Sequence, residues 1–293
     1  MPATPHFDHS PYLVRPGHKV RLNDYRTKAG PEFKNKSEAR AALRENIADL
    51  TESQRVLWAS AEYAFLIILQ GPDASGKDGL VRHVFSGVNP QGCVVHSFAA
   101  PNEEEVRHHF LWRPSRYLPA KGQISVFNRS YYEEVLIVRV HPKFLDAQRF
   151  PPGQPGEDIW QLRFDDINSF EKGLVHSATH ILKFYLHLSK EEQKKRFLAR
   201  LTEPEKHWKF SDADIHERRH WKDYRQAYED MLAHTSTDWA PWYIVPADNK
   251  WYARALVADI VAARLGALPL RYPQLDQDQK RRLLEAKREL ESE

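Results

Sequence analysis

A nine-residue glycine-rich stretch constrains this chain more than any other feature. It reads Gly71-Pro72-Asp73-Ala74-Ser75-Gly76-Lys77-Asp78-Gly79 and follows the apolar run 64–70. A short aliphatic run that ends at a glycine is typical of a strand buried on both faces, and residues 80–85 have helical spacing. A strand, a glycine-rich turn and a helix in this order predict a phosphate-binding loop. The glycines let successive N–H groups face one anion, and Lys77 adds a full positive charge.

Two carboxylates distinguish this loop from the usual pattern. Asp78 stands where a Ser or Thr commonly places its hydroxyl on Mg²⁺, and Asp73 lies inside the loop. The alternative is a glycine-rich turn with a solvated lysine, which the flanking strand and helix disfavour. The residues expected to contact phosphate are Gly71, Ala74, Ser75, Gly76, Lys77, Asp78 and Gly79.

Composition excludes several classes of protein. A chain of 293 residues with 41% hydrophobic and 28% charged residues is long enough for one large α/β domain with appendages. A net charge of +3 is only mildly basic, so an anionic partner must be held by local clusters. The single Cys93 excludes an internal disulfide and a Cys-rich zinc site, and we expect it in a buried strand of a cytoplasmic protein. No apolar stretch approaches the roughly 20 residues of a membrane span, so we expect a soluble, unprocessed chain.

Periodicity divides the chain into an arm, a core and a tail. Residues 1–36 lack a sustained period and predict an irregular arm on the surface, residues 37–275 the main α/β domain, and residues 276–293 a charged C-terminal helix. A helix begins near Ser37, and a second start signal at Thr51 leaves open one kinked helix or two. The remaining expected strands are 93–98, 122–127, 179–188 and 242–247, and the remaining expected helices are 102–112, 158–176, 252–265 and one that starts at Ser189.

A polar cluster follows the predicted strand 122–127. It reads Asn128-Arg129-Ser130-Tyr131-Tyr132-Glu133-Glu134. Ligands of open parallel sheets bind beyond the carboxyl ends of the strands, so we expect the cluster beside the glycine-rich loop. Arg129 is well placed there to bind an anion through two hydrogen bonds. The alternative is a helix cap built by Asn128 and Ser130.

The segment after residue 189 is basic and aromatic. A capping box at Ser189 and Glu192 starts a helix that carries Lys194 and Lys195, and such a run is more often a solvated face than a site. The next residues, 205–214, interleave bases with aromatics, and the following helix sets Trp221, Tyr224 and Tyr228 on one side, most simply for packing. A mobile basic segment late in a phosphate-loop fold nonetheless fits a lid at about 202–225 that carries Lys209, Arg218 and Arg219.

Taken together, these motifs resemble a family-2 polyphosphate kinase over about residues 15–275. The residues that carry the resemblance are Gly71-x-Asp73-x-x-Gly76-Lys77-x-Gly79, Phe127-Asn128-Arg129-Ser130-x-Tyr132-Glu133-x-Val135, and Trp208-Lys209-Phe210 followed by Arg218 and Trp221. The resemblance implies a thymidylate-kinase-like phosphate-loop fold that transfers a phosphoryl group between inorganic polyphosphate and a nucleotide. Residues 127–140 are most similar to the branch associated with both AMP and ADP.

The resemblance also implies Mg²⁺, which Mn²⁺ can replace. Asp73 and Asn128 are the expected metal ligands, with the greater part on Asp73 because many relatives carry Asp at position 128. The expected partners are polyphosphate and adenine nucleotides, with guanine nucleotides as an alternative, and a second copy of the chain in a homo-oligomer. Neither a nucleic acid nor a membrane is an expected partner.

Phosphoryl transfer needs positioning and charge neutralisation more than a covalent catalyst, which fits this residue set. We expect Lys77 and the loop to hold polyphosphate, Asp73 to hold Mg²⁺, and Arg129 to clamp the acceptor phosphate. The nucleotide side is expected to include Asn128, Tyr132, Glu133 and Glu134; Arg218 and Arg219 are expected to act from the lid, and Lys194, Lys195 and Lys209 to contact the donor chain.

Two other functions remain open from the sequence. An ATP-dependent nucleoside monophosphate kinase would use the same loop but needs no extended basic tract. A non-catalytic polyanion binder would explain the basic linker, but it would be indifferent to Lys77 and to Mg²⁺.

Overall fold

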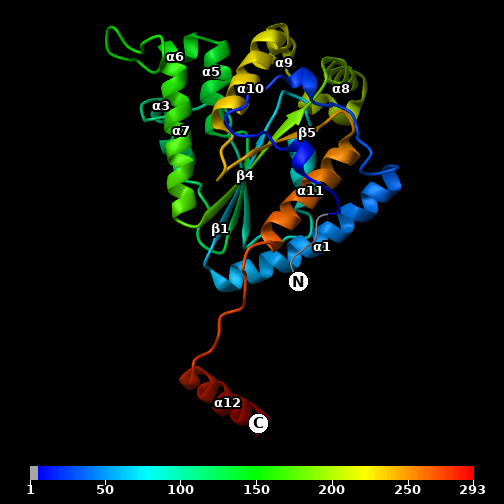
Figure 1. Cartoon of the computed structure of the whole chain (residues 1–293), viewed down its shortest axis with the longest axis vertical. Coiled ribbons are helices and arrows are strands. Elements are labelled where there is room, and N and C mark those ends of the chain that lie inside the picture. Colours follow the sequence, from blue (N-terminus) through cyan, green and yellow to red (C-terminus); the bar gives the residue numbers. More distant parts are fainter. Residues whose placement is uncertain (1–5) are drawn as a thin grey trace.

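The centre of the molecule is a parallel sheet. The computed structural model describes residues 6–293, and within them five strands run in the order β2-β3-β1-β4-β5, each parallel to its neighbours. Figure 1 shows helices on both faces of the sheet, which confirms the predicted α/β architecture. The strands are β1 (Ala64–Gln70), β2 (Cys93–Ser97), β3 (Ile124–Asn128), β4 (Thr179–His187) and β5 (Trp242–Pro246).

The central strand β1 is buried along its whole length. It pairs with β3 on one side, where Leu69 lies opposite Asn128, and with β4 on the other, where Gln70 lies opposite Tyr185. The carboxyl ends of these three strands therefore lie at one edge of the sheet. Any residues that follow them are placed side by side, although they are far apart in sequence.

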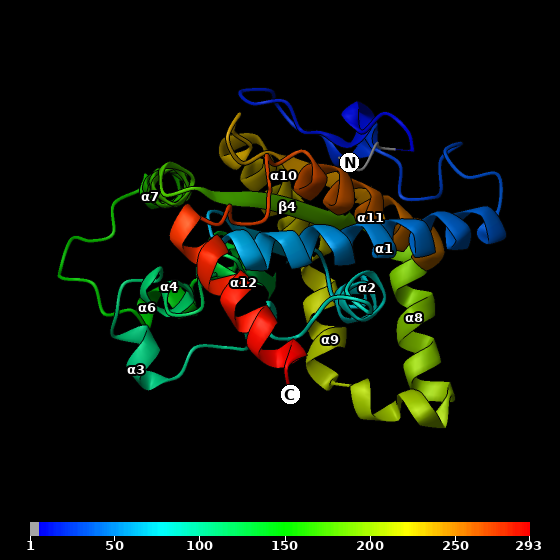
Figure 2. The same cartoon turned by 90° about the horizontal axis from the view of Figure 1, so that it is seen from below.

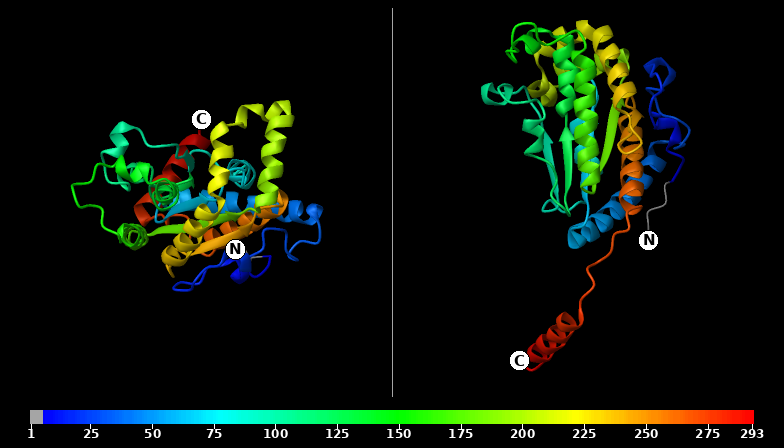
Figure 3. Two further views of the ribbon diagram at one scale, coloured as in Figure 1. Left: turned by 90° about the horizontal axis from the view of Figure 1, so that it is seen from above. Right: turned by 60° about the vertical axis from the view of Figure 1, so that its left-hand side comes forward.

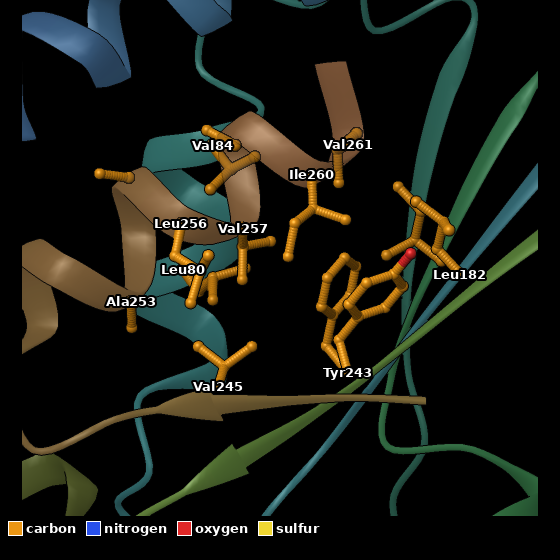
Figure 4. Close-up of a cluster of buried hydrophobic side chains, with 14 of the residues drawn as sticks. Leu80, Val84, Leu182, Tyr243, Val245, Ala253, Leu256, Val257, Ile260 and Val261 are labelled. Atoms are coloured by element: carbon orange, nitrogen blue, oxygen red, sulfur yellow. The ribbon is translucent and has the colours of Figure 1, made fainter. Parts of the chain in front are cut away.

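Three helices cover one face of the sheet: α1 (Lys36–Ser60), α2 (Lys77–Val84) and α11 (Lys250–Gly266). The views in Figure 1 and Figure 2 show α1 and α11 lying alongside each other. Figure 4 shows how α2 and α11 pack, with Leu80 and Val84 meeting Leu256, Val257 and the strand residue Val245. The helix that follows the glycine-rich loop is thus fixed to the core by its own apolar face.

The opposite face is covered by α7 (Ile159–His176), α10 (Trp221–Thr235) and two short segments, the 3-10 helix η3 (Tyr131–Val135) and α5 (Ile137–Val140). A second hydrophobic cluster forms there around Phe127, Phe164, Met231 and Trp242. Since η3 begins three residues after the end of β3, this packing also fixes the backbone of the polar cluster that follows β3.

The N-terminal arm is irregular, as expected, but it is not confined to the surface. Val14 and Leu22 are at most 1% exposed, and the N–H of Val14 donates to the carbonyl of Trp242 at 2.9 Å beside a bridge between Leu13 and Tyr243. The arm therefore covers the edge strand β5 and contributes to the core. Pairing with backbone groups that a sheet edge leaves free gives an irregular segment a fixed position.

A helical hairpin projects beyond the sheet. It comprises α8 (Lys190–Thr202), the 3-10 helix η4 (Pro204–Lys209), α9 (Asp212–Glu217) and the 3-10 helix η5 (Arg218–His220), and Figure 2 and Figure 3 show α8 and α9 side by side. An ion pair of 2.5 Å between Arg200 and Asp214 joins the two helices. The lid predicted at 202–225 corresponds to the outer part of this hairpin and the start of α10.

The tail ends in α12 (Gln277–Glu291), which lies away from the sheet at the end of an extended linker (Figure 1). None of its residues is buried. Among residues 6–293, no helix is both long enough and apolar enough to cross a membrane.

Two local expectations differ from the structure, and one open question is resolved. The expected helix 102–112 is two four-residue helices, α3 (Glu103–Val106) and α4 (Trp112–Ser115), because the chain turns between them. The open question at Thr51 resolves to one helix, because its hydroxyl bonds back to the carbonyl of Ile47 at 2.7 Å instead of capping a new start. Cys93 is only half-buried, since β2 lies at the edge of the sheet. One further short helix, α6 (Lys143–Asp146), lies in the segment that leads to α7.

Candidate active site

The glycine-rich loop forms the turn that the sequence predicts between β1 and α2. Three of its residues have positive φ: Gly71 at 151°, Ala74 at 62° and Gly76 at 108°. A side chain at Gly71 would come within 3.0 Å of the Leu186 backbone carbonyl and the Ser75 hydroxyl, so only glycine fits there. The side chain of Lys77 lies inside the loop, and its Nζ donates to the Gly71 carbonyl at 2.7 Å.

Two further observations indicate that the loop is built to hold an anion. Ser75 Oγ is buried and has no hydrogen-bond partner among the described residues. Burial lowers the pKa of Lys77, and the Arg129 guanidinium lowers it further. A buried ammonium group near a second cation is unfavourable unless an anion enters, so a phosphate group would relieve both costs.

The end of β3 meets the loop through Arg129. Its Nη2 donates to Asp73 Oδ1 at 2.6 Å, and its backbone φ of 63° turns the side chain toward the cleft. The predicted neighbourhood of loop and strand end is therefore correct. The pair places the Arg129 guanidinium beside the Asp73 carboxylate at the mouth of the loop.

Asn128 points to a different carboxylate. Its amide nitrogen donates to Asp78 Oδ1 at 2.7 Å and to Ser97 Oγ at 3.3 Å. The structure thus pairs Asn128 with the residue after the lysine and does not bring it to Asp73. As metal ligands, Asp73 and Asn128 stay predictions.

Glu133 completes the floor of the cleft. In the orientation of the Gln70 amide that satisfies all its neighbours, the amide nitrogen donates to Glu133 Oε1 at 3.1 Å. Burial raises the pKa of Glu133, while Arg129 and Lys77 oppose that change. A carboxyl group held between two cations can accept a proton or a hydrogen bond from a ligand hydroxyl.

The helical hairpin reaches this cleft through one arginine. Arg218 lines the cleft with Asp73, Arg129 and Glu133, and its Nη1 donates to Gln193 Oε1 at 2.7 Å. Arg219 and Lys209 are exposed and lie outside the cleft. Lys194 and Lys195 are exposed too, on the side of α8 that faces away from the buried Gln193 and Arg196, so the structure does not bring them to the loop.

Two residues predicted to contact the nucleotide have side chains that pack in the core and do not line the cleft. Tyr132 is fully buried and donates its hydroxyl to Glu171 Oε1 at 2.7 Å. Glu134 is 7% exposed and pairs with Arg163 at 3.2 Å. The 3-10 conformation of η3 turns both side chains away from the cleft and leaves Glu133 facing it.

Sequence reasoning missed the support behind the loop, which comes from α8. Arg196 donates through Nη1 to the carbonyls of Ala74 and Ser75 at 2.9 Å each, and through Nη2 to Ala247 and Asp248 at 2.7 and 2.9 Å. Gln193 donates to the Asp73 carbonyl at 3.0 Å. The i,i+3 spacing of Gln193 and Arg196 placed them on one helix face, but nothing in the sequence showed that this face meets the loop.

Sequence reasoning also missed a set of cations on the other side of the loop. It comprises Arg40, Arg82, Lys250 and Arg254, from α1, α2 and α11, and is called the cation track below. Burial lowers the pKa of Arg254, and Arg82, Arg196 and Arg40 lower it further. Within residues 6–293, none of the four forms an ion pair with a carboxylate within 4.0 Å. Clustered cations without direct ion-pair partners favour a polyanionic ligand.

A metal ion, if bound, requires ligands beyond the protein. The described residues hold no group of three or more His, Cys, Asp or Glu side chains placed to bind a metal ion. Mg²⁺ commonly uses one or two carboxylates and completes its shell with phosphate oxygens and water. Asp73, half-buried at the mouth of the loop, fits that requirement.

Comparisons with known proteins agree with the site. The profile of the family described as Polyphosphate kinase 2 (PPK2) matches residues 33–269. An ADP-polyphosphate phosphotransferase of Rhodopseudomonas palustris is 48% identical over 95% of this chain and 97% of its own length. An AMP/ADP-polyphosphate phosphotransferase of Meiothermus ruber is 41% identical over 90% of this chain and 95% of its own length. The crystal structure of a polyphosphate kinase 2 from Arthrobacter aurescens superposes with a TM-score of 0.83, at 39% identity, over 93% of this chain and 95% of that one.

Proposed function

The chain belongs to the polyphosphate kinase 2 family, and from that premise we propose that it transfers the terminal phosphoryl group of inorganic polyphosphate to AMP and to ADP. It is a polyphosphate-dependent nucleotide phosphotransferase. The statement that both AMP and ADP act as acceptors is the more specific part of the proposal. It is supported by the Meiothermus ruber relative, whose name includes both nucleotides.

The cation track is the observation that favours polyphosphate as the donor. A donor phosphate in the loop would place the rest of the donor beside α2 and α11, where Arg82, Arg254 and Lys250 lie. A nucleoside triphosphate would need a pocket for its base there, whereas a chain of phosphates needs repeated cations. This charge pattern disfavours the ATP-dependent monophosphate kinase.

The roles of the site residues follow from their positions. Lys77 and the loop N–H groups hold the transferring phosphoryl group, and Arg129 clamps the acceptor phosphate. Asp73 orients Mg²⁺, which neutralises the phosphate oxygens when it is bound. Arg218 closes from the lid over developing negative charge, and Gln193 holds it in position.

The proposal extends to the surroundings of the enzyme. Mn²⁺ replaces Mg²⁺ at the phosphate oxygens, and guanine nucleotides are alternative acceptors. We place the protein in the cytoplasm as a homo-oligomer. The exposed apolar residues of the edge strand β2, Val94 and Val95, support self-association.

The decisive experiment supplies a single donor. Purified protein is incubated with Mg²⁺ and AMP, with either polyphosphate or ATP as sole donor, and products are separated by ion-exchange chromatography after contaminating adenylate kinase has been excluded. We expect ADP and then ATP from polyphosphate. Transfer from ATP alone would support the monophosphate kinase, and a reaction that stops at ADP would refute the dual acceptor.

The cation track can be tested by charge removal. Arg254→Gln should raise KM for long polyphosphate by about tenfold and change KM for the nucleotide little, because one charge-assisted contact contributes roughly 1.5 kcal/mol. Arg281→Gln on the exposed α12 is the matched control. If both substitutions changed KM for long polyphosphate equally, the cation track would have no part in donor binding.

A further inference from the structure

A second cavity opens beside the cleft that holds Asp73 and Arg129. Its volume is about 400 Å³, within the range of roughly 300–1,000 Å³ typical of small-molecule sites. It shares Pro72, Trp221, Tyr224 and Tyr228 with that cleft, so the two spaces adjoin each other. A molecule whose phosphate lies at Arg129 can therefore extend into this cavity.

The aromatic side chains in the walls of the cavity come from three parts of the chain, and the other lining residues include Pro72, Lys190 and Glu191. The N-terminal arm contributes Tyr25 and Thr27, the end of β4 contributes Tyr185 and His187, and the start of α10 contributes Trp221. The ring of Tyr185 lies 4.7 Å from that of Tyr228 and 5.9 Å from that of His187. Aromatic walls suit a flat, conjugated ligand better than a chain of phosphates.

One wall residue has a defined hydrogen-bonding role. Nδ1 of His187 lies 3.2 Å from the carbonyl of Arg26, which can only accept, so the ring donates through Nδ1. Burial lowers the pKa of His187 to about 4, which keeps the ring neutral near pH 7. The Nε2 of a neutral ring that donates through Nδ1 is an acceptor.

We propose that this cavity binds the purine base of the acceptor nucleotide, and that His187 Nε2 accepts a hydrogen bond from an exocyclic amino group of the base. The N-terminal arm then forms one wall of the nucleotide site, with Tyr25 against the base. This inference rests on the proposed function, because it places the acceptor phosphate at Arg129. It also gives the arm a role beyond covering β5.

A hydrogen-bond acceptor that contacts the base affects which nucleotides the enzyme prefers as substrates. The 6-amino group of adenine donates a hydrogen bond, whereas the 6-oxo group of hypoxanthine only accepts. Nε2 of His187 therefore favours AMP over inosine monophosphate, whose ribose and phosphate are the same. A wrong base leaves this buried acceptor unpaired, and such mismatches are strongly disfavoured.

The first experiment removes the arm's wall. Tyr25→Ala should raise KM for AMP by about tenfold and leave KM for polyphosphate unchanged, because only the acceptor contacts Tyr25. Tyr272→Ala, a half-exposed tyrosine in the linker to α12, is the matched control. Thermal unfolding of both variants shows whether the arm is still in place. An unchanged KM for AMP, or an equal rise for both substrates, would overturn the proposal.

The second experiment tests the hydrogen bond itself. His187→Asn keeps a donor for the Arg26 carbonyl but removes the Nε2 acceptor, so the ratio of kcat/KM for AMP to that for inosine monophosphate should fall by about tenfold. His176→Asn, exposed at the end of α7, is the control. A ratio that stays at the wild-type value would overturn the role of His187.

A binding measurement separates this inference from the proposed function. AMP titrated into the wild-type protein and both variants, followed by tryptophan fluorescence, reports the base site without turnover, since Trp221 lines the cavity. Wild-type protein that binds AMP but does not use polyphosphate would refute the function and leave the base site supported. If the wild-type protein transfers phosphate from polyphosphate but Tyr25→Ala binds AMP as well as the wild type does, the proposed function would be supported and the base site would be refuted.

Discussion

At the scale of single residues, the loop is arranged around a charge that it cannot neutralise by itself. Lys77 has only backbone carbonyls of its own loop as hydrogen-bond partners, at Gly71 and Pro72. These carbonyls satisfy its protons but provide no counter-charge. Asp73 is already paired with Arg129, and Glu133 and Asp78 act on Lys77 without a direct contact, so the ammonium group itself has no carboxylate bound to it.

Replacing Lys77 tests this directly. Lys77→Ala should lower kcat by about 10³-fold, or ~4 kcal/mol, because the residue stabilises charge on the transferring group. Thermal stability should not fall, since the variant removes a buried charge and no ion pair. Lys287→Ala on α12 is the control, and wild-type turnover by Lys77→Ala would exclude the loop from the mechanism.

His187 predicts a pH dependence of stability. Its folded pKa of about 4 lies below the ordinary 6.5, chiefly because of burial, with Arg225 acting in the same direction and Asp248 against it. Only the unfolded chain binds the proton between these values, so stability is complete above pH 6.5 and falls as pH decreases toward 4. The shift corresponds to about 3 kcal/mol. His187→Asn should unfold with a smaller loss between pH 6.5 and 4.5 than wild type or His176→Asn, and identical slopes would contradict this assignment.

At the scale of elements, a buried ion pair joins three of them. Lys183 in β4 lies 2.5 Å from Glu171 in α7, and both side chains are fully buried. Tyr131 and Tyr132 of η3 donate to the same carboxylate at 2.8 and 2.7 Å. The network fixes η3 to the sheet, and η3 carries Glu133 and begins two residues after Arg129.

Breaking this pair should be costly. Lys183→Met leaves the Glu171 carboxylate buried without its cation and should lower the free energy of unfolding by about 3–5 kcal/mol. The double variant Lys183→Met/Glu171→Leu should recover part of that loss, because it removes both charges. Urea unfolding measures all three stabilities. A double variant less stable than the single one would contradict an uncompensated charge as the cause.

The elements that the sequence predicted best are those whose signal is local. The strands 64–70 and 179–187 were predicted from apolar runs, and the loop was predicted from its glycines and its lysine. The helix expected at 102–112 failed because Phe110 and Leu111 pack against the second cluster after a turn, a tertiary demand that periodicity does not record. The role of Arg196 could not be predicted for the same reason, since the backbone carbonyls that it binds belong to two turns that are far from it in the sequence.

At the scale of the whole molecule, the sheet separates two kinds of surface around one loop. Cations from α1, α2 and α11 lie on one side, and aromatic residues from β4, α10 and the arm lie on the other. Such a division suits a phosphoryl donor that is a chain of charged phosphates and an acceptor nucleotide that carries an aromatic base. The sequence predicted the loop between them, but neither surface, because each is assembled from at least three separate segments.

The C-terminal tail, with the helix α12, contributes to neither of these two surfaces. The residues of α12 are all exposed, including Leu283, Leu284 and Leu290, so deleting residues 276–293 removes no buried contact of the subunit. We expect the truncated protein to keep its kcat and to unfold within about 2 °C of the full chain, which corresponds to less than ~1 kcal/mol. Light scattering in parallel reports the oligomer, whose mass per subunit should fall only by the deleted residues. A lower number of subunits together with a clear loss of stability would contradict this expectation, and would show that the leucines of α12 pack against another copy of the chain.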